Sequence, residues 1–140
     1  MNLARKLVDR YVLHKVFSVK RSDELLVSDS TLRDGEQTPE ISLLPMEKVR
    51  IAKLLADLGV DSIDAAFAGA GECEIEALKK ISAYFGKSRN MPKITTLCRA
   101  VESDIDRAYE GLSEAPVDKR GVSIFIGTSP THRQYKFGGA

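Results

Sequence analysis

The run DSTLRDGEQ, residues 29–37, follows directly on the apolar run LLVS at residues 25–28. A short apolar run of this kind indicates a buried strand. Gly35 breaks the strand pattern, and Pro39 extends the break into a loop. Charged and amide side chains therefore gather at the end of a predicted strand, which is where α/β folds carry their functional groups.

Helix-like and strand-like segments alternate outward from this loop. The expected helices are residues 3–17, 46–58, 74–84 and 103–112, and the further expected strands are residues 60–67, 93–97 and 121–126; residues 127–140 are expected to be loop. Strands that alternate with helices imply parallel pairing through right-handed crossovers. Two architectures fit: a small doubly wound sheet of four strands, or half of an eight-stranded barrel, which needs about 250 residues when complete. Periodicity leaves both open.

The side chains of residues 29–37 suit two kinds of loop. Asp29, Asp34 and Glu36 offer hard carboxylate oxygens for a divalent ion. A guanidinium such as that of Arg33 stabilises an oxyanion beside such an ion, and Gly35 permits a tight turn. The plainer interpretation is a polar loop in which Arg33 pairs with Asp34 or Glu36, and the chemistry alone leaves both open.

Composition narrows the class of protein. The chain has 140 residues and a net charge of +1, which gives no electrostatic argument for nucleic acid or an anionic membrane as a partner. No stretch approaches the length of a transmembrane helix. Cys73 and Cys98 form no CxxC pair, so we expect two buried thiols in a reducing cytoplasm.

The longer run DSTLRDGEQTP, residues 29–39, resembles the signature of the metal-dependent condensing barrels. These include the 2-isopropylmalate, homocitrate and citramalate synthases, with hydroxymethylglutaryl-CoA lyase and the pyruvate carboxyltransferases as more distant members. Further segments match in order, at residues 46–64, 97–100, 104–105, 128–132 and 135–136. The resemblance implies an α/β fold that is the first half of a (β/α)8 TIM barrel, with about four parallel strands in residues 25–140. A helical extension in residues 1–24 would precede it.

The resemblance also implies an acetyl-CoA-dependent acyltransferase. Such an enzyme adds acetyl-CoA to a 2-oxo acid by a Claisen-type condensation, as in leucine-type amino-acid biosynthesis. Arg33 is then implied to stabilise the enolate or alkoxide, and Asp34 to bind a divalent ion, Mg²⁺, Mn²⁺ or Zn²⁺. The substrate-contacting residues implied by the resemblance are Gln37, Asp64, Ser129 and His132.

The chain departs from the family pattern at three places. The family's remaining metal ligands form an HxH pair on a later strand, whereas this sequence has only His14 and His132. The second-strand motif Glu-Ala-Gly-Phe-Pro is DAAFA here, at residues 64–68. Glu40 stands where the family commonly has glycine.

These departures imply a truncated chain that is inactive alone. The missing ligands would come from a complementing second half or from another copy in a homo-oligomer. Two alternatives stay open: a metal-dependent carbon–carbon lyase of the same superfamily, and a non-catalytic remnant or subunit. The Gly-Glu-Gln that follows Asp34 favours the synthases over the lyases.

Overall fold

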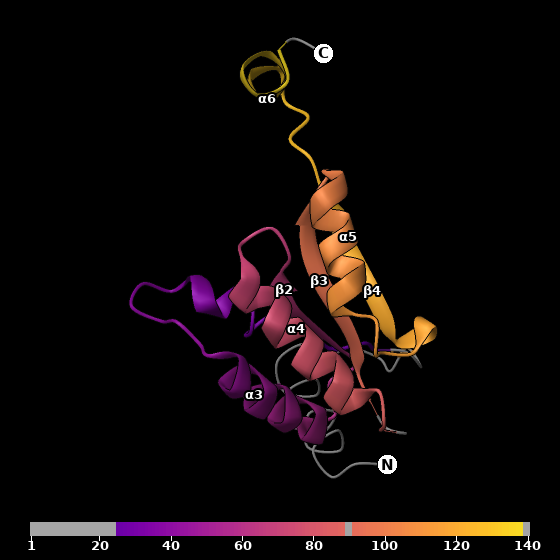
Figure 1. Ribbon diagram of the computed structural model, residues 1–140. Helices are drawn as coiled ribbons and strands as arrows, with labels where there is room; N and C mark the ends of the chain where they lie inside the picture. The colour runs from indigo at the N-terminus through magenta and orange to yellow at the C-terminus, as the bar shows by residue number, and fades with distance from the viewer. Residues whose placement is uncertain (1–24, 89–90, 139–140) are drawn as a thin grey trace.

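Figure 1 shows the computed structural model, which describes residues 25–88 and 91–138. Within these residues, parallel strands form one sheet in the order β1-β2-β3-β4. The strands are β1 (Ser28–Asp29), β2 (Ser62–Phe67), β3 (Lys93–Arg99) and β4 (Arg120–Phe125). The helices are α3 (Pro45–Leu58), α4 (Glu72–Phe85), α5 (Glu102–Gly111) and α6 (Pro130–Lys136), with 3₁₀ turns η2 (Gly35–Gln37) and η3 (Val117–Lys119). None of these helices has the length and apolar character needed to cross a membrane. The helix expected at residues 3–17 lies outside the described residues.

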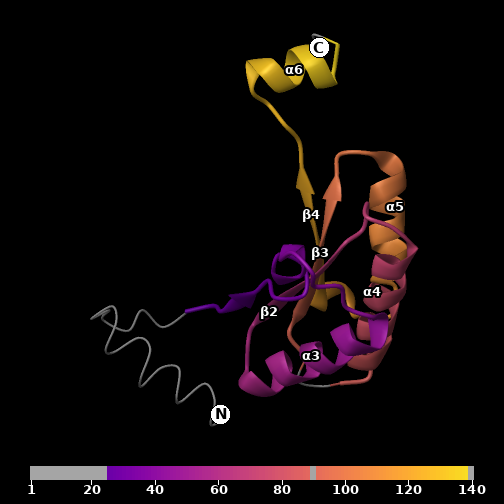
Figure 2. The ribbon, with the colours of Figure 1, turned by 90° about the vertical axis from the view of Figure 1, so that its left-hand side faces the viewer.

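The order of the strands and the placement of the helices decide between the two architectures. Helices α3, α4 and α5 all lie on one face of the sheet (Figure 2). Right-handed crossovers between strands in consecutive order place every helix on the same face, whereas a doubly wound sheet reverses its order and covers both faces. The expected α/β fold, with strands arranged as in the first half of a (β/α)8 barrel, is therefore confirmed.

The apolar core lies between the sheet and these three helices. Helices α3 and α4 each turn one stripe of residues toward Ile63 and Ile94, which are fully buried in the sheet. The stripe residues in this cluster are Val49, Ala52, Leu55, Leu78 and Ile81, and Ile75 of the same face of α4 packs in a neighbouring cluster with Cys98. Burying a leucine or isoleucine side chain stabilises a fold by about 1.5–3 kcal/mol relative to leaving it exposed, so this layer holds the helices on the sheet.

Several expected boundaries are wrong. Strand β1 begins at Ser28, because Leu25 and Leu26 are exposed and lie outside its ladder with β2. Strand β2 begins two residues later than expected, and β3 continues two residues further. Part of the expected C-terminal loop is the helix α6: Ser129 Oγ accepts the N–H of His132 at its start, and proline fits its first turn.

The expectation of two buried thiols is correct for Cys98 and wrong for Cys73. Cys98 lies on the helix-covered face of β3 and is fully buried. Cys73 lies in the first turn of α4, two residues before Ile75 on the buried stripe, and a spacing of two in a helix points to a different face.

The loop after β1 has its unusual backbone conformation at Glu40 and not at Gly35. Among the described non-glycine residues, Glu40 alone has a positive φ, at 69°, while the φ of Gly35 is not positive. A side chain in this left-handed region costs about 1–2 kcal/mol. The turn that includes Gly35 therefore does not use the positive φ that glycine permits, and the residue of this loop whose backbone suits glycine is Glu40.

We expect Glu40→Gly to raise the free energy of unfolding by about 0.5–1 kcal/mol, because glycine adopts this φ without a Cβ contact. Chemical denaturation followed by circular dichroism measures the change. Glu40→Ala is the matched control, since it removes the same charge but keeps the Cβ, and it should stay within about 0.5 kcal/mol of the parent. Equal gains from both variants would mean that the charge, and not the backbone, is responsible.

Candidate functional site

Arg33, Asp34 and Asp64 meet where the loop that follows β1 passes beside β2. Arg33 Nε donates to Asp64 Oδ2 at 2.7 Å, and its Nη1 donates to Asp34 Oδ1 at 2.6 Å. Ser30 Oγ donates to the same Asp64 oxygen at 3.1 Å. The hydrogen bond to Asp64, together with the charges of both carboxylates, raises the pKa of Arg33 above its ordinary value. Arg33 thus pairs with Asp34, as the plainer interpretation expected, and is also held by a carboxylate of the next strand.

A β-bulge in β2 puts Asp64 and Phe67 on the same side of the sheet. Ala65 is an extra residue between two residues of β2 that pair with consecutive residues of β3. In a regular strand, side chains three positions apart point to opposite faces, and one extra residue brings them to the same face. Phe67 contacts Phe125 of β4, with ring centroids 6.2 Å apart. The bulge therefore turns a carboxylate and an aromatic ring together toward the face that the helices leave uncovered.

Asp64 reaches Arg33 although it is one methylene shorter than the glutamate of the family pattern. Its side chain is largely buried, and its second oxygen, Oδ1, has no hydrogen-bond partner among the described residues. A buried carboxylate oxygen without a partner costs free energy. Oδ1 is therefore a buried acceptor of this cluster that remains for a further donor.

A pocket of about 300 Å³ opens beside Arg33. Arg33 and Gln37 line it together, so two of the predicted site residues share one cavity. Ile41, Leu43 and Phe67 supply apolar walls. Small-molecule sites in proteins typically combine an apolar lining with a few converging polar groups in a space of about 300–1,000 Å³, and this pocket lies at the small end of that range.

Lys48 of α3 is fully buried between two residues that line this pocket, and the sequence analysis did not identify it. Its Nζ contacts Glu36 Oε2 at 2.5 Å and also contacts Glu74, and these two side chains are 18% and 15% exposed. The sequence does contain a pattern that indicates its burial. Lys48 lies four residues before Ala52 and so falls on the apolar stripe of α3. A lysine on a buried stripe requires carboxylate partners, and the loop after β1 supplies one.

A second ion pair joins the end of β3 to α5, between the exposed side chain of Arg99 and the buried carboxylate of Asp104. Arg99 Nε and Nη2 donate to the two carboxylate oxygens of Asp104 at 2.7 and 2.8 Å, and the backbone N–H of Arg99 donates to Oδ2 at 3.2 Å. The Arg99 hydrogen bonds hold the pKa of the Asp104 carboxyl below its usual range. Gly69 packs against the pair, since a Cβ there would lie 2.5 Å from Asp104 Oδ2. The loops after β2 and β3 are thereby fixed against one another.

Ser129 and His132 lie together at the start of α6. Ser129 Oγ lies 2.9 Å from His132 Nδ1 and accepts the backbone N–H of that histidine at 3.2 Å. Helix α6 projects beyond the end of β4, away from the loop after β1 (Figures 1 and 2). The structure therefore unites four of the six predicted site residues and leaves these two outside the cluster.

The described residues do not form a metal site by themselves. In residues 25–88 and 91–138, no group of three or more His, Cys, Asp and Glu side chains is arranged to hold an ion. Asp34, the predicted ligand, is 61% exposed and paired with Arg33, so it offers one carboxylate at most.

Known proteins resemble this chain along most of its length. A family model described as HMGL-like matches residues 24–140. The chain is 50% identical over 113 residues to the 2-isopropylmalate synthase of Pyrococcus abyssi, a match that covers 81% of this chain and 22% of that protein. It is 44% identical over 122 residues to the 2-isopropylmalate synthase of Sulfolobus acidocaldarius, covering 86% and 29%. It is 40% identical over 116 residues to the 2-isopropylmalate synthase of Neisseria meningitidis, a match that covers 83% of this chain and 21% of that protein. The chain thus spans less than a third of the length of these curated relatives.

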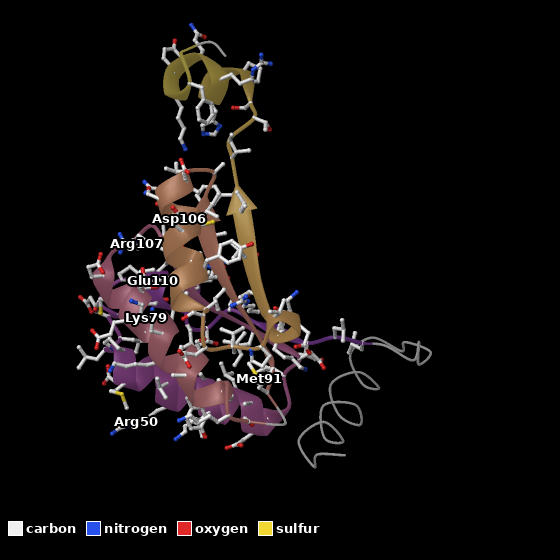
Figure 3. All side chains as sticks on the ribbon, turned by 45° about the vertical axis from the view of Figure 1, so that its right-hand side comes forward. Arg50, Lys79, Met91, Asp106, Arg107 and Glu110 are labelled. Atoms are coloured by element: carbon white, nitrogen blue, oxygen red, sulfur yellow. The ribbon has the colours of Figure 1, made fainter. Side chains whose placement is uncertain are left out.

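Replacing Lys48 with methionine should lower the free energy of unfolding by about 3–5 kcal/mol, because two nearly buried carboxylates lose their cation. Lys79→Met is the matched control. Lys79 pairs with Glu110 between α4 and α5 (Figure 3), but both side chains are exposed, so its loss should leave stability almost unchanged. Urea denaturation measures the free energy of unfolding of both variants. Similar decreases in the two would show that the burial of Lys48 does not contribute to stability.

Asp104→Asn should remove stability only where the carboxyl group is ionised. Because Arg99 lowers the folded-state pKa below the unfolded value of about 3.9, the stabilisation is present above that value and is lost as the pH falls through the folded pKa. The gap in unfolding free energy between parent and variant should be constant between about pH 5 and 7 and shrink below about pH 4. Asp106→Asn, at an exposed position of α5 (Figure 3), is the control. A gap for Asp104→Asn that persists into acid would contradict the pairing.

Proposed function

The chain belongs to the HMGL-like family, and from this membership we propose that it provides part of the active site of an acyltransferase that condenses acetyl-CoA with a 2-oxo acid. The observation that carries the proposal is the cluster of Arg33, Asp34 and Asp64 beside a pocket at the ends of β1 and β2. The name of the relatives, 2-isopropylmalate synthase, supports a condensation of this kind, in leucine-type biosynthesis, over a carbon–carbon lyase.

Arg33 carries the central role in the proposed reaction. A base removes a proton from the methyl group of acetyl-CoA, and when the resulting carbanion adds to the ketone carbon, negative charge develops on the ketone oxygen. Arg33 donates to that oxygen, and its hydrogen bonds to Asp64 and Asp34 hold the guanidinium in place before the substrate arrives. A donor oriented in advance contributes about 2.7–4 kcal/mol of transition-state stabilisation. Gln37 contacts the 2-oxo acid in the same pocket, and hydrolysis of the thioester then releases CoA.

We also propose Asp34 as one ligand of a divalent ion. The described residues do not complete that site. When bound, the ion would polarise the ketone of the 2-oxo acid, and the roles given above to Arg33 and Gln37 are those of this chain's own residues. The remaining ligands come from a second half or from another copy of the chain. Ser129 and His132 remain predicted rim residues, and the cytoplasm remains the predicted location.

A chimera tests the proposal. Residues 25–138 replace the matching segment of the Pyrococcus abyssi 2-isopropylmalate synthase, and CoA release is measured with acetyl-CoA, a panel of 2-oxo acids and a divalent ion. We expect CoA release, and a fall in kcat of about 100- to 1,000-fold when Arg33→Ala is introduced. Arg50→Ala, at an exposed position of α3 (Figure 3), is the control and should leave kcat unchanged.

Two outcomes would overturn the proposed function. One is a chimera that folds as the parent enzyme does but releases no CoA with any 2-oxo acid. The other is an active chimera in which Arg33→Ala behaves as Arg50→Ala does. Either result favours a non-catalytic role for this chain.

A further inference from the structure

We propose that Lys48 is a positioning residue that couples the segment carrying Arg33 to the segment carrying Asp64. Lys48 acts through two intermediaries, Glu36 and Glu74, whose side chains both contact its Nζ. The catalytic part of this inference rests on the proposed function, whereas the structural coupling does not.

The two glutamates divide their oxygens in the same way. Glu36 pairs with the Lys48 ammonium through Oε2 and accepts the N–H of Leu43 with Oε1, at 2.8 Å. Glu74 accepts from the Lys48 ammonium with Oε1 and from the N–H of Phe67 with Oε2, the latter at 3.0 Å. Lys48 therefore joins two backbone segments that are distant in the sequence. An ammonium carries three donors around a compact charge, which suits a position between two carboxylates.

These two segments carry the functional cluster. Glu36 lies three residues after Arg33, in the 3₁₀ turn of the loop that follows β1. Phe67 lies three residues after Asp64, at the end of β2. A shift of either segment therefore moves one partner of the 2.7 Å hydrogen bond between Arg33 and Asp64.

Because Lys48 is buried, water cannot easily take the place of its contacts with Glu36 and Glu74. Lys48 is fully buried, whereas the pair of Lys79 and Glu110 on the outer surface is open to solvent. Charge-assisted hydrogen bonds are stronger away from water, so the loss of one partner affects every group that it held. The groups held by Lys48 also line the pocket: Glu36, Leu43, Phe67 and Glu74.

Amide hydrogen exchange on the chain itself tests the coupling without any assay of activity. In Lys48→Met, the amides of Leu43 and Phe67 should both exchange faster, by about tenfold or more, because neither glutamate is held in place. The amide of Ala100, which is hydrogen-bonded to β4, should change by less than about threefold. Lys79→Met is the matched control and should leave all three amides unchanged.

A triple variant keeps the test decisive if Lys48→Met does not fold. Lys48→Met combined with Glu36→Gln and Glu74→Gln removes all three charges, and uncharged residues of similar volume are commonly tolerated in place of a buried ion cluster. The triple variant should fold. The amides of Leu43 and Phe67 should still exchange faster in it than in the parent chain, because the ammonium that joined the two segments is absent.

Kinetics of the chimera test the catalytic part. Lys48→Met or the triple variant should lower kcat by about 10- to 100-fold and change the KM for acetyl-CoA by less than about threefold, because a displaced Arg33 affects the transition state more than binding. A lysine that only stabilises the fold would change neither value below the unfolding temperature.

The outcomes separate this inference from the proposed function. Faster exchange at both amides together with a lower kcat supports the positioning role. Faster exchange at one of the two amides, or a uniform increase at every amide, overturns the coupling, and an unchanged kcat overturns the positioning role. If the unsubstituted chimera releases no CoA, the proposed function fails, and the amide pattern still decides whether Lys48 couples the two segments.

Discussion

The buried ammonium of Lys48 is the constraint on which the site depends. It lies on the apolar stripe of α3, where a charge is tolerated only because Glu36 and Glu74 flank it. A cluster of this kind adds little stability relative to an apolar core. Its effect here is on geometry, since it determines how the loop after β1 and the start of α4 approach one another. The cluster of Arg33 and Asp64 is built on the two segments that this contact brings together.

The general placement of the site could be predicted from the sequence, and the reason is topological. Parallel strands in consecutive order deliver their carboxyl ends to one edge of the sheet, so a polar run directly after a strand indicates where functional groups collect. The run around Arg33 and Asp34 met this condition, and the alternation of elements indicated the fold class. Gln37 then lies in the same pocket as Arg33, because both belong to one short loop.

What the sequence did not predict depends on how side chains meet in the folded chain. Lys48 falls on the apolar stripe of α3, but its partners Glu36 and Glu74 lie on other segments. Arg99 and Asp104 are close in the sequence, yet their pairing depends on how α5 begins after β3. Helix α6 was missed because seven residues with no buried stripe give almost no periodic signal, and its start depends on the single side chain of Ser129. The bulge at Ala65 could not be predicted from the sequence, because Ala65 and the neighbouring Ala66 are the same residue type and nothing distinguishes the extra one.

The extra residue at Ala65 also determines how this strand can vary during evolution. A regular strand cannot turn side chains three positions apart to one face, so Asp64 and Phe67 share a face only while the strand keeps its irregularity. A homologue with a regular strand would retain the shared face only by losing one residue between the carboxylate and the ring. Alignment of the two sequences would then contain a gap at this place and not a substitution. The spacing between these two side chains, more than the identity of the small residues that separate them, is therefore what keeps them on one face.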